Sequence, residues 1–303
     1  MATLYNQADS NIRKTYLLVG VFLVLIIGVG FLFSQIWQSP DILYFAVIFS
    51  VLTSFFSYWY SDRVVLFTTR ARLIEKSDNP ELYRVVENLC LTAGLPFPKV
   101  YIIPESQPNA FATGRNKKHA VVAVTEGLLE RLEKAELEGV IAHELSHIKN
   151  KDLLLQTMVV VLVGVIALLA NLFLRFGLLG GFSGKGNNNR RSNAGGILML
   201  LGLVAAILAP IAATLLKLGI SRKREFLADA SGALLTRYPE GLAQALEKIS
   251  ADPTPMFRAS NSTAHLFISS PFKGKQSASW FTKLFLTHPP VEERLAALRG
   301  LRV

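Results

Sequence analysis

Long apolar runs separated by polar stretches are the strongest pattern in the sequence. Four runs of about 20 residues contain no Asp, Glu, Lys or Arg, and each is long enough to cross a bilayer as a helix. They are Thr15–Phe33, Ile42–Tyr60, Leu153–Leu174 and Ile197–Leu216. The first run lacks the small-residue processing site of a signal peptide, so we expect it to stay in the protein as an anchor. The pattern therefore predicts four transmembrane helices.

The polar segments between these runs are long enough for one folded domain. Residues 63–152 and 217–303 together make about 175 residues, which suffices for a domain with its own core, so we expect them to fold together. The glycines and asparagines of residues 175–196 predict a flexible loop. The expected division is an N-terminal membrane hairpin (1–62), a first part of the domain (63–152), a second membrane hairpin with this loop (153–216) and a second part of the domain (217–303).

Within the polar segments, helical patterns outnumber strands. Residues 99–104 (KVYIIP) and 119–124 (HAVVAV) have the β-branched and aromatic composition of strands. Apolar residues at helical spacing mark residues 79–94, 125–147, 221–237, 240–250 and 289–301. The fold class predicted for the domain is therefore α+β, helix-rich, with a small sheet.

Composition and charge add an orientation in the membrane. Hydrophobic residues make up 51% of the 303 residues, and the formal net charge is +10. The basic residues border the apolar runs and form no single stripe, which indicates membrane flanks and no nucleic-acid partner. Arg13 and Lys14 precede the first run and Arg63 follows the second, so we expect both flanks to be cytoplasmic. The single cysteine, Cys90, is expected to be a buried, reduced thiol.

Residues 142–152 (AHELSHIKNKD) carry the pattern of a catalytic metal site. His143 and His147 lie four positions apart, so a helix places their side chains about 40° apart in azimuth and about 6 Å apart along its axis. Two imidazoles in this arrangement can bind one tetrahedral cation, and the intervening position of Glu144 suits a general base acting on water. We also expect this helix to continue unbroken from His147 into the third apolar run.

A catalytic zinc usually has three protein ligands, so a further donor is expected. Residues 221–230 (SRKREFLADA) offer Glu225 as the third ligand and Asp229, four positions on, as the acceptor for the free ring N–H of a ligating histidine. The alternative is an ordinary charged helix face exposed to solvent. Two predicted spans lie between His147 and Glu225, so both residues return to the same side of the membrane.

Four motifs, taken in order, closely resemble those of the HtpX-type integral-membrane zinc metalloproteases, which belong to the gluzincin group and are relatives of the CAAX prenyl proteases. They are NAFATG (109–114), HELSHIKNKD (143–152), SRKREFLAD (221–229) and LTHPPVEERLAAL (286–298). The resemblance covers essentially the whole chain. It implies a zincin-like cytoplasmic domain with one Zn²⁺ per chain, held by His143, His147 and Glu225, with Glu144 as the base.

The resemblance also implies roles that spacing does not indicate. Asn109 is implied to hold the main chain of the substrate, His288 to stabilise the oxyanion, and Arg222 to form an ion pair near the third ligand. Lys151 stands where many members carry arginine, which keeps the charge but not the planar guanidinium.

The function implied by the resemblance is a stress-response protease of the bacterial plasma (inner) membrane, which degrades misfolded or damaged membrane proteins. Its partners are then membrane-protein or unfolded polypeptide substrates and the lipid bilayer. An extended substrate is expected to add as a strand to an edge offered by residues 109–114 or 119–124. Two alternatives stay open: a catalytically silent membrane scaffold or holding protein with structural zinc, and a specific processing protease.

Overall fold

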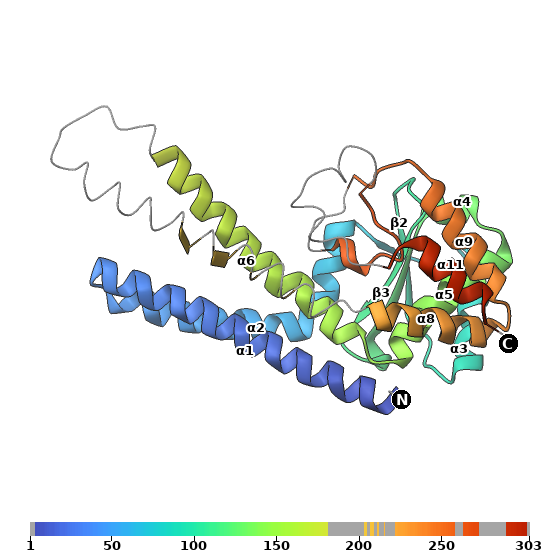
Figure 1. The fold of residues 1–303 in the computed structure, drawn as a ribbon, viewed down its shortest axis with the longest axis horizontal. Coiled ribbons are helices and arrows are strands. Elements are labelled where there is room, and N and C mark those ends of the chain that lie inside the picture. The colour runs from blue at the N-terminus through green and yellow to red at the C-terminus, as the bar shows by residue number, and fades with distance from the viewer. Residues whose placement is uncertain are drawn as a thin grey trace.

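Three long helices project from one side of a compact domain, and the amino-terminal end of the chain lies beside that domain (Figure 1). The helices are α1 (Leu4–Trp37), α2 (Pro40–Thr69) and α6 (Leu153–Gly180). This arrangement is that of a computed structural model. It describes residues 4–180, 203–204, 207–208, 211, 215, 222–257, 263–272 and 289–301, and the side chains of all of these except 4–9 and 172–180.

Each of the long helices contains a segment apolar enough to cross a membrane. In the described part of the chain these segments are Ser10–Trp37, Pro40–Thr69 and Leu153–Asn171, which contain or closely match the first three predicted spans. The fourth predicted span lies outside the described residues, apart from a few positions. Of these, Val204 and Leu208 are buried in one apolar cluster with Leu18 and Leu162, so they pack against α1 and α6.

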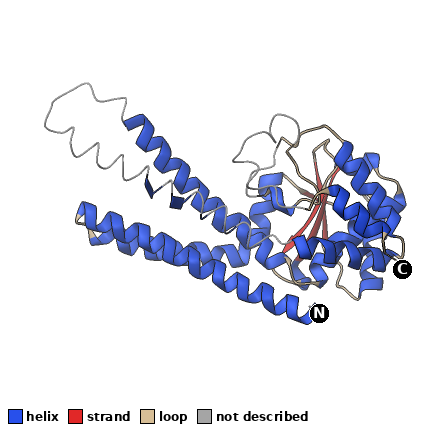
Figure 2. Ribbon diagram, viewed as in Figure 1, coloured by secondary structure: helices blue, strands red, loops and turns tan. Residues whose placement is uncertain are grey.

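A sheet of four strands lies at the centre of the domain (Figure 2). The order of the strands is β1-β2-β4-β3; β2 and β4 are parallel, and both outer pairs are antiparallel. The strands are β1 (Arg72–Leu73), β2 (Lys99–Ile103), β3 (Ala110–Gly114) and β4 (Ala120–Thr125). The two predicted strands are therefore confirmed as β2 and β4. Because β4 is internal, only β3 of the two candidate segments offers an edge.

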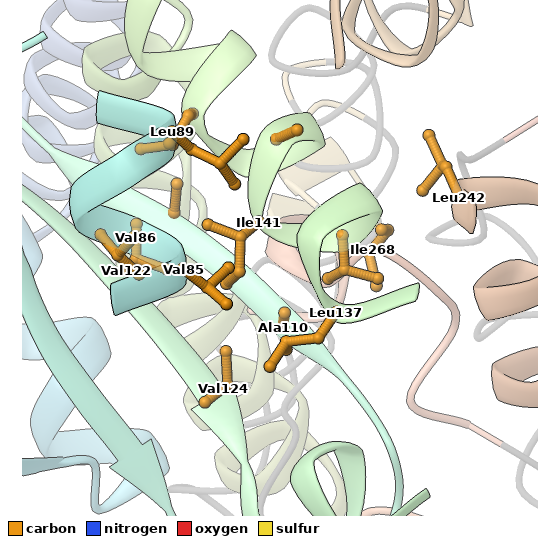
Figure 3. Packing of buried hydrophobic residues seen from close by; sticks show 14 of the residues in the cluster. Val85, Val86, Leu89, Ala110, Val122, Val124, Leu137, Ile141, Leu242 and Ile268 are labelled. Atoms are coloured by element: carbon orange, nitrogen blue, oxygen red, sulfur yellow. The ribbon is translucent and has the colours of Figure 1, made fainter. Parts of the chain in front are cut away.

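The two faces of the sheet pack against different parts of the molecule. Side chains alternate along a strand, so Val122 and Val124 of β4 face one layer while Val121 and Ala123 face the other. The first layer is the main core, in which the sheet meets α3 and α5 (Figure 3). The second layer includes Val65 and Leu66 of α2 and Val160 of α6. The sheet is thus seated on the domain-side ends of the membrane helices.

Helices from both polar segments contribute to the main core. They are α3 (Pro80–Ala93), α4 (Glu126–Arg131), α5 (Lys134–Lys149), α8 (Arg222–Thr236), α9 (Pro239–Ala251) and α11 (Val291–Arg299), with single 3₁₀ turns η1 (Lys117–His119) and η2 (Ala264–Leu266). The helix ends follow local chemistry: the side chain of Asn79 accepts the N–H of Leu82 at the start of α3, and Gly94 ends that helix with a φ of 65°.

The prediction of one continuous helix from the HExxH motif into the third span is wrong. Helix α5 ends at Lys149, Lys151 adopts a left-handed φ of 59°, and α6 begins only at Leu153. The main-chain N–H of Asp152 closes the turn by bonding the carbonyl of His147, and the carbonyl of Asp152 accepts the N–H of Gln156 at the start of α6. The chain therefore turns between the two helices.

Two further boundaries differ from the predicted ones. The segment 125–147 forms two helices, because Glu133 starts α5 with a reciprocal capping box to Glu136. Helix α6 continues to Gly180, past Leu174, where the predicted loop was expected to begin.

Close contact between α5 and α8 depends on a glycine. A Cβ atom at Gly232 of α8 would lie 2.9 Å from the main-chain nitrogen of His143 and 3.1 Å from the carbonyl carbon of Ala142. Both neighbours are main-chain atoms, so they can yield only if the helices separate. A glycine at this position therefore sets how near Glu225 comes to the two histidines.

We expect Gly232→Ala to destabilise the folded protein by about 1 to 3 kcal/mol, because α8 must move away from α5. The measurement is thermal unfolding followed with a thiol-reactive dye, since the only cysteine, Cys90, is buried. Gly28→Ala is the matched control, because a Cβ atom there meets nothing within 4 Å. Equal melting temperatures for the two variants would contradict the assigned role of Gly232.

Candidate metal centre

Helices α5 and α8 bring three predicted ligands together. The Nε2 atoms of His143 and His147 lie 3.2 Å apart. Glu225 places one carboxylate oxygen 3.9 Å from Nε2 of His143 and the other 3.7 Å from Nε2 of His147. All three residues are buried, and the three ligand atoms lie within 4.8 Å of one another.

These separations fit a tetrahedral metal ion. Zinc binds imidazole nitrogen and carboxylate oxygen at about 2.0 to 2.2 Å, which places two ligands of one tetrahedron about 3.3 Å apart. The distance between the two histidine nitrogens matches this value. The two carboxylate distances belong to different oxygens of Glu225, and one ligand atom from each residue lies within 4.8 Å of the others, so the carboxylate has to turn toward the histidines to share one ion with them. The donor set therefore fits one metal ion.

The other ring nitrogen of each histidine faces a buried carboxylate. Nδ1 of His143 lies 2.9 Å from Oδ1 of Asp229, and Nδ1 of His147 lies 3.0 Å from Oδ2 of Asp152. A proton on each Nδ1 leaves a lone pair on each Nε2, and the two lone pairs then point at the same place. Two lone pairs only 3.2 Å apart repel each other unless a cation or a shared proton lies between them.

Asp229 is held in turn by Arg294 of α11. Nε and Nη2 of Arg294 donate to the two oxygens of Asp229 at 2.8 and 2.7 Å, and Nη1 donates to the main-chain carbonyl of Ile268 at 2.9 Å. Arg294 is only 1% exposed. Burial opposes the charge of Asp229, but Arg294 outweighs burial and lowers the pKa of this carboxyl. The carboxylate behind His143 is therefore ionised and fixed in direction.

Asp152 is held from the membrane side. Nδ2 of Asn11, in α1, donates to Oδ1 of Asp152 at 2.6 Å, and Nη1 of Arg224 donates to Oδ1 of Asn11 at 3.1 Å. Arg224 is 2% exposed. The predicted ion-pair partner, Arg222, is exposed at the first position of α8. The buried arginine at this end of α8 is thus Arg224.

The pKa values of the two histidines shift in opposite directions. Burial lowers the pKa of His143. Burial also opposes the charge on His147, but its hydrogen bond to Asp152 and the nearby carboxylate of Glu225 raise its pKa to about 9. In the metal-free protein, a proton on His147 can be shared by the two facing Nε2 atoms. A metal ion that binds here displaces that proton.

Glu144 lies beside the metal site and is 2% exposed. Burial raises its pKa to about 7, with Glu225 adding to the shift, while His147 and a main-chain hydrogen bond from Ala112 of β3 act against it. A carboxyl group with a pKa near 7 exchanges a proton readily at physiological pH. Glu144 therefore has the burial and the pKa of a general acid and base.

Asn109, immediately before β3, is fully buried, and its side chain is bonded to a peptide group of the same chain. Its Nδ2 donates to the carbonyl of Ser269 at 3.0 Å, and the N–H of Ser269 donates to its Oδ1 at 3.3 Å. The N–H of Ile268 bonds the carbonyl of Ala110 at 2.9 Å. A segment of the same chain thus lies along the first part of the edge of β3.

The structure brings together His143, Glu144, His147, Glu225 and Asp229, whereas His288 lies outside the described residues. Sequence reasoning did not single out the buried partners of these residues. Asp152 carried a signal, because Asn150 and Asp152 lie close together and both residue types are common at helix ends. The charged helix 291–299 gave no sign that Arg294, alone among its charged residues, would be buried.

Comparison with known proteins identifies one peptidase family by a family model and by similar sequences. Residues 76–302 match Peptidase family M48, and this range includes the three candidate ligands. The chain is 45% identical to the protease HtpX homolog of Caldanaerobacter subterraneus subsp. tengcongensis, covering 99% of each protein. It is 47% identical to the protease HtpX homolog of Pyrococcus furiosus, covering 95% of each. The solved structure of S. mikatae Ste24p matches with a TM-score of 0.49 and 19% identity, covering 94% of this chain and 65% of that one.

We expect the purified protein to bind one metal ion per chain and Glu225→Gln to bind far less, because the amide removes the anionic ligand. The measurement is metal content by mass spectrometry after gel filtration with a mild chelator. Glu144→Gln is the control: it removes a neighbouring carboxylate that is not a predicted ligand, so it should retain the metal. If the two variants retained equal amounts of metal, Glu225 would not be the third ligand.

We expect Arg294→Lys to weaken metal binding by about 10- to 100-fold, because lysine cannot hold both oxygens of Asp229 and His143 loses its fixed direction. Competition with a fluorescent zinc chelator measures this change. Arg299→Lys, on the same helix, is the matched control, since Arg299 forms exposed ion pairs with Glu240 and Glu247. The outcome that refutes the assigned role is equal affinity in both variants.

Proposed function

The chain belongs to peptidase family M48 and is an integral-membrane metalloprotease, and we propose that it is a zinc endopeptidase that degrades misfolded or damaged membrane proteins. The observation that carries this proposal is the convergence of His143, His147 and Glu225 beside the buried carboxyl of Glu144. The relatives named as protease HtpX homologs support the hydrolytic part of this proposal, and the resemblance of the motifs supports the part on damaged membrane proteins.

The ligand set favours zinc among the metals that such a site can hold. Two imidazoles and one carboxylate on helices are typical of catalytic zinc, which keeps one position open for substrate or water. A bound zinc ion supplies a Lewis acid for the scissile carbonyl and for the attacking water. The carboxylates of Asp229 and Asp152 keep both imidazoles in the tautomer that presents Nε2.

Glu144 moves the proton in this proposal. Its carboxylate accepts a proton from the attacking water and then delivers that proton to the leaving amine nitrogen, so no acyl-enzyme forms. The main-chain N–H of Ala112 helps to orient the carboxylate. Burial supports both steps, because a pKa of about 7 lets the same group accept and release a proton.

Substrate recognition is proposed to rest on main-chain hydrogen bonds along β3. This strand is at the edge of the sheet and contacts Glu144 through Ala112. Asn109 is proposed to hold the main chain of the substrate, which requires the substrate to replace Ser269, because both ends of its amide are bonded to that residue. His288 is proposed to stabilise the oxyanion. Recognition of this kind depends little on side chains and gives broad specificity.

The site is proposed to face the cytoplasm at the surface of a plasma membrane. Asn11 near the start of α1 and Asp152 just before α6 are hydrogen-bonded to each other, so both helices leave the same side of the domain. The basic residues that flank the first two spans favour the cytoplasm for that side. The division of the chain into two membrane hairpins and two parts of one domain is likewise proposed, and the shared core of residues 74–153 and 233–298 supports it.

We expect Glu144→Gln to abolish cleavage of an unfolded protein such as casein while zinc content and melting temperature stay close to those of the unsubstituted protein. The loss should be about 10²-fold or more, because the amide cannot accept the proton. In the unsubstituted protein, cleavage should slow as the pH falls below about 7, where Glu144 becomes protonated. Cleavage by a zinc-loaded Glu144→Gln variant at the unsubstituted rate would refute the proposed mechanism.

A further inference from the structure

A cavity of about 500 Å³ lies where α2 meets the domain. Its described lining includes none of the three candidate metal ligands. Two aromatic side chains of α2, Trp59 and Tyr60, form one wall, and residues of the sheet form the other. The cavity is therefore separate from the metal centre, and nothing in the proposed hydrolysis uses it.

Cations from several elements converge on this cavity. Arg63 comes from α2, Lys99 from the start of β2, and Arg115 and Lys118 from the turn between β3 and β4. As far as its lining is described, Asp62 is the only carboxylate. Four positive charges around one cavity repel one another, and an anion with several oxygens would relieve that repulsion.

Two of the cations are fixed against the aromatic wall. The guanidinium of Arg115 lies over the ring of Trp59 at 4.3 Å from its centroid, and that of Arg63 lies over Tyr60 at 5.1 Å. Arg115 is also 3.1 Å from the ring of His119 through Nη2. These contacts hold the planar donors of both arginines in place, which is the arrangement that suits a phosphate group.

The position of the cavity indicates that the phosphate belongs to a lipid. Trp59 and Tyr60 lie in the candidate span of α2, just before Arg63, and are 44% and 41% exposed. Exposed Trp and Tyr residues at the end of a span mark the level of the lipid headgroups. The bond between Thr113 of β3 and Thr157 of α6, at 3.0 Å, holds the basic turn after β3 beside the first turns of another span.

The adjoining surface of α2 suits the acyl chains of such a lipid. Leu52, Phe55 and Phe56 lie on the same face of α2 as Trp59, at helical spacing, and are 48%, 56% and 52% exposed. The apolar face thus leads to a cavity lined by cations and aromatic rings. Because these side chains belong to a candidate span, acyl chains lie directly beside the cavity, and a phosphate bound there can be part of the same lipid.

We propose that the cavity binds the phosphate headgroup of an anionic phospholipid from the leaflet on the domain side, with its acyl chains along α2. Arg63, Arg115 and Lys118 bind the phosphate oxygens. The lipid then bridges the end of α2 and the turn between β3 and β4, and so it fixes how the sheet sits on the membrane surface.

The test measures lipid selectivity at Trp59. Phe substitutions at Trp37 and Trp280 leave Trp59 as the only tryptophan of the full-length protein. The protein is reconstituted in phosphatidylcholine vesicles that contain brominated phosphatidylglycerol or, in parallel, the same fraction of brominated phosphatidylcholine. Bromine quenches tryptophan in contact with the lipid, so we expect a preference for phosphatidylglycerol of roughly fivefold or more.

A matched pair of double variants distinguishes binding in the cavity from attraction by the overall positive charge of the protein. Arg63→Gln with Lys118→Gln removes two cations of the cavity and should reduce the preference to within about twofold. Arg84→Gln with Lys134→Gln removes two exposed cations of α3 and α5 and should leave it unchanged. Thermal unfolding with the thiol-reactive dye confirms that each variant is folded.

Three results would overturn the proposal. The first is equal quenching by the two lipids in the protein with Trp59 alone. The second is a preference that survives loss of Arg63 and Lys118 in a folded variant. The third is release of the quenching lipid by inorganic phosphate at a lower concentration than that of the phosphatidylglycerol, which would assign the cavity to a soluble anion.

Discussion

The structure depends on one buried carboxylate, Asp152, which lies between the metal centre and the membrane helices. One oxygen accepts a hydrogen bond from His147, a predicted metal ligand, and the other accepts one from Asn11 of α1. Asp152 stands in the turn between α5 and α6, where the domain meets a span. The direction of a ligand imidazole is therefore set by the positions of two membrane helices as well as by the helix that carries it.

The other histidine, His143, is also oriented by a buried carboxylate, but from the carboxyl-terminal part of the domain. Asp229 holds His143 and is itself held by Arg294 near the carboxyl end of the chain. Each buried charge in these two side-chain networks has a partner. Removal of one member of a buried pair typically costs about 3 to 5 kcal/mol of folding stability. The candidate metal ligands thus join segments that are far apart in sequence. If these residues bind a metal ion, its binding is coupled to folding of the two parts of the domain.

The sequence predicts which candidate ligands come together better than it predicts what orients them. A spacing of four on a helix brings His143 and His147 together by geometry alone, and the apolar runs predict the first three spans by length. The turn before α6 depends on the bonds of Asp152, while helical periodicity continues across it. The partner of Asn109 is Ser269, 160 positions away, and no local pattern indicates that contact.

The hydrogen bond between Asn11 and Asp152 limits how this enzyme can be truncated. A soluble version made by deleting the amino-terminal helices would keep every predicted zinc ligand and the proposed general base. Judged by these residues alone, its site would be complete. It would nevertheless remove Asn11, which contacts both Asp152 and Arg224. The lipid-embedded part is therefore a structural component of the catalytic apparatus, and excision of the hydrolytic unit as a free module should yield a site with a loosened ligand.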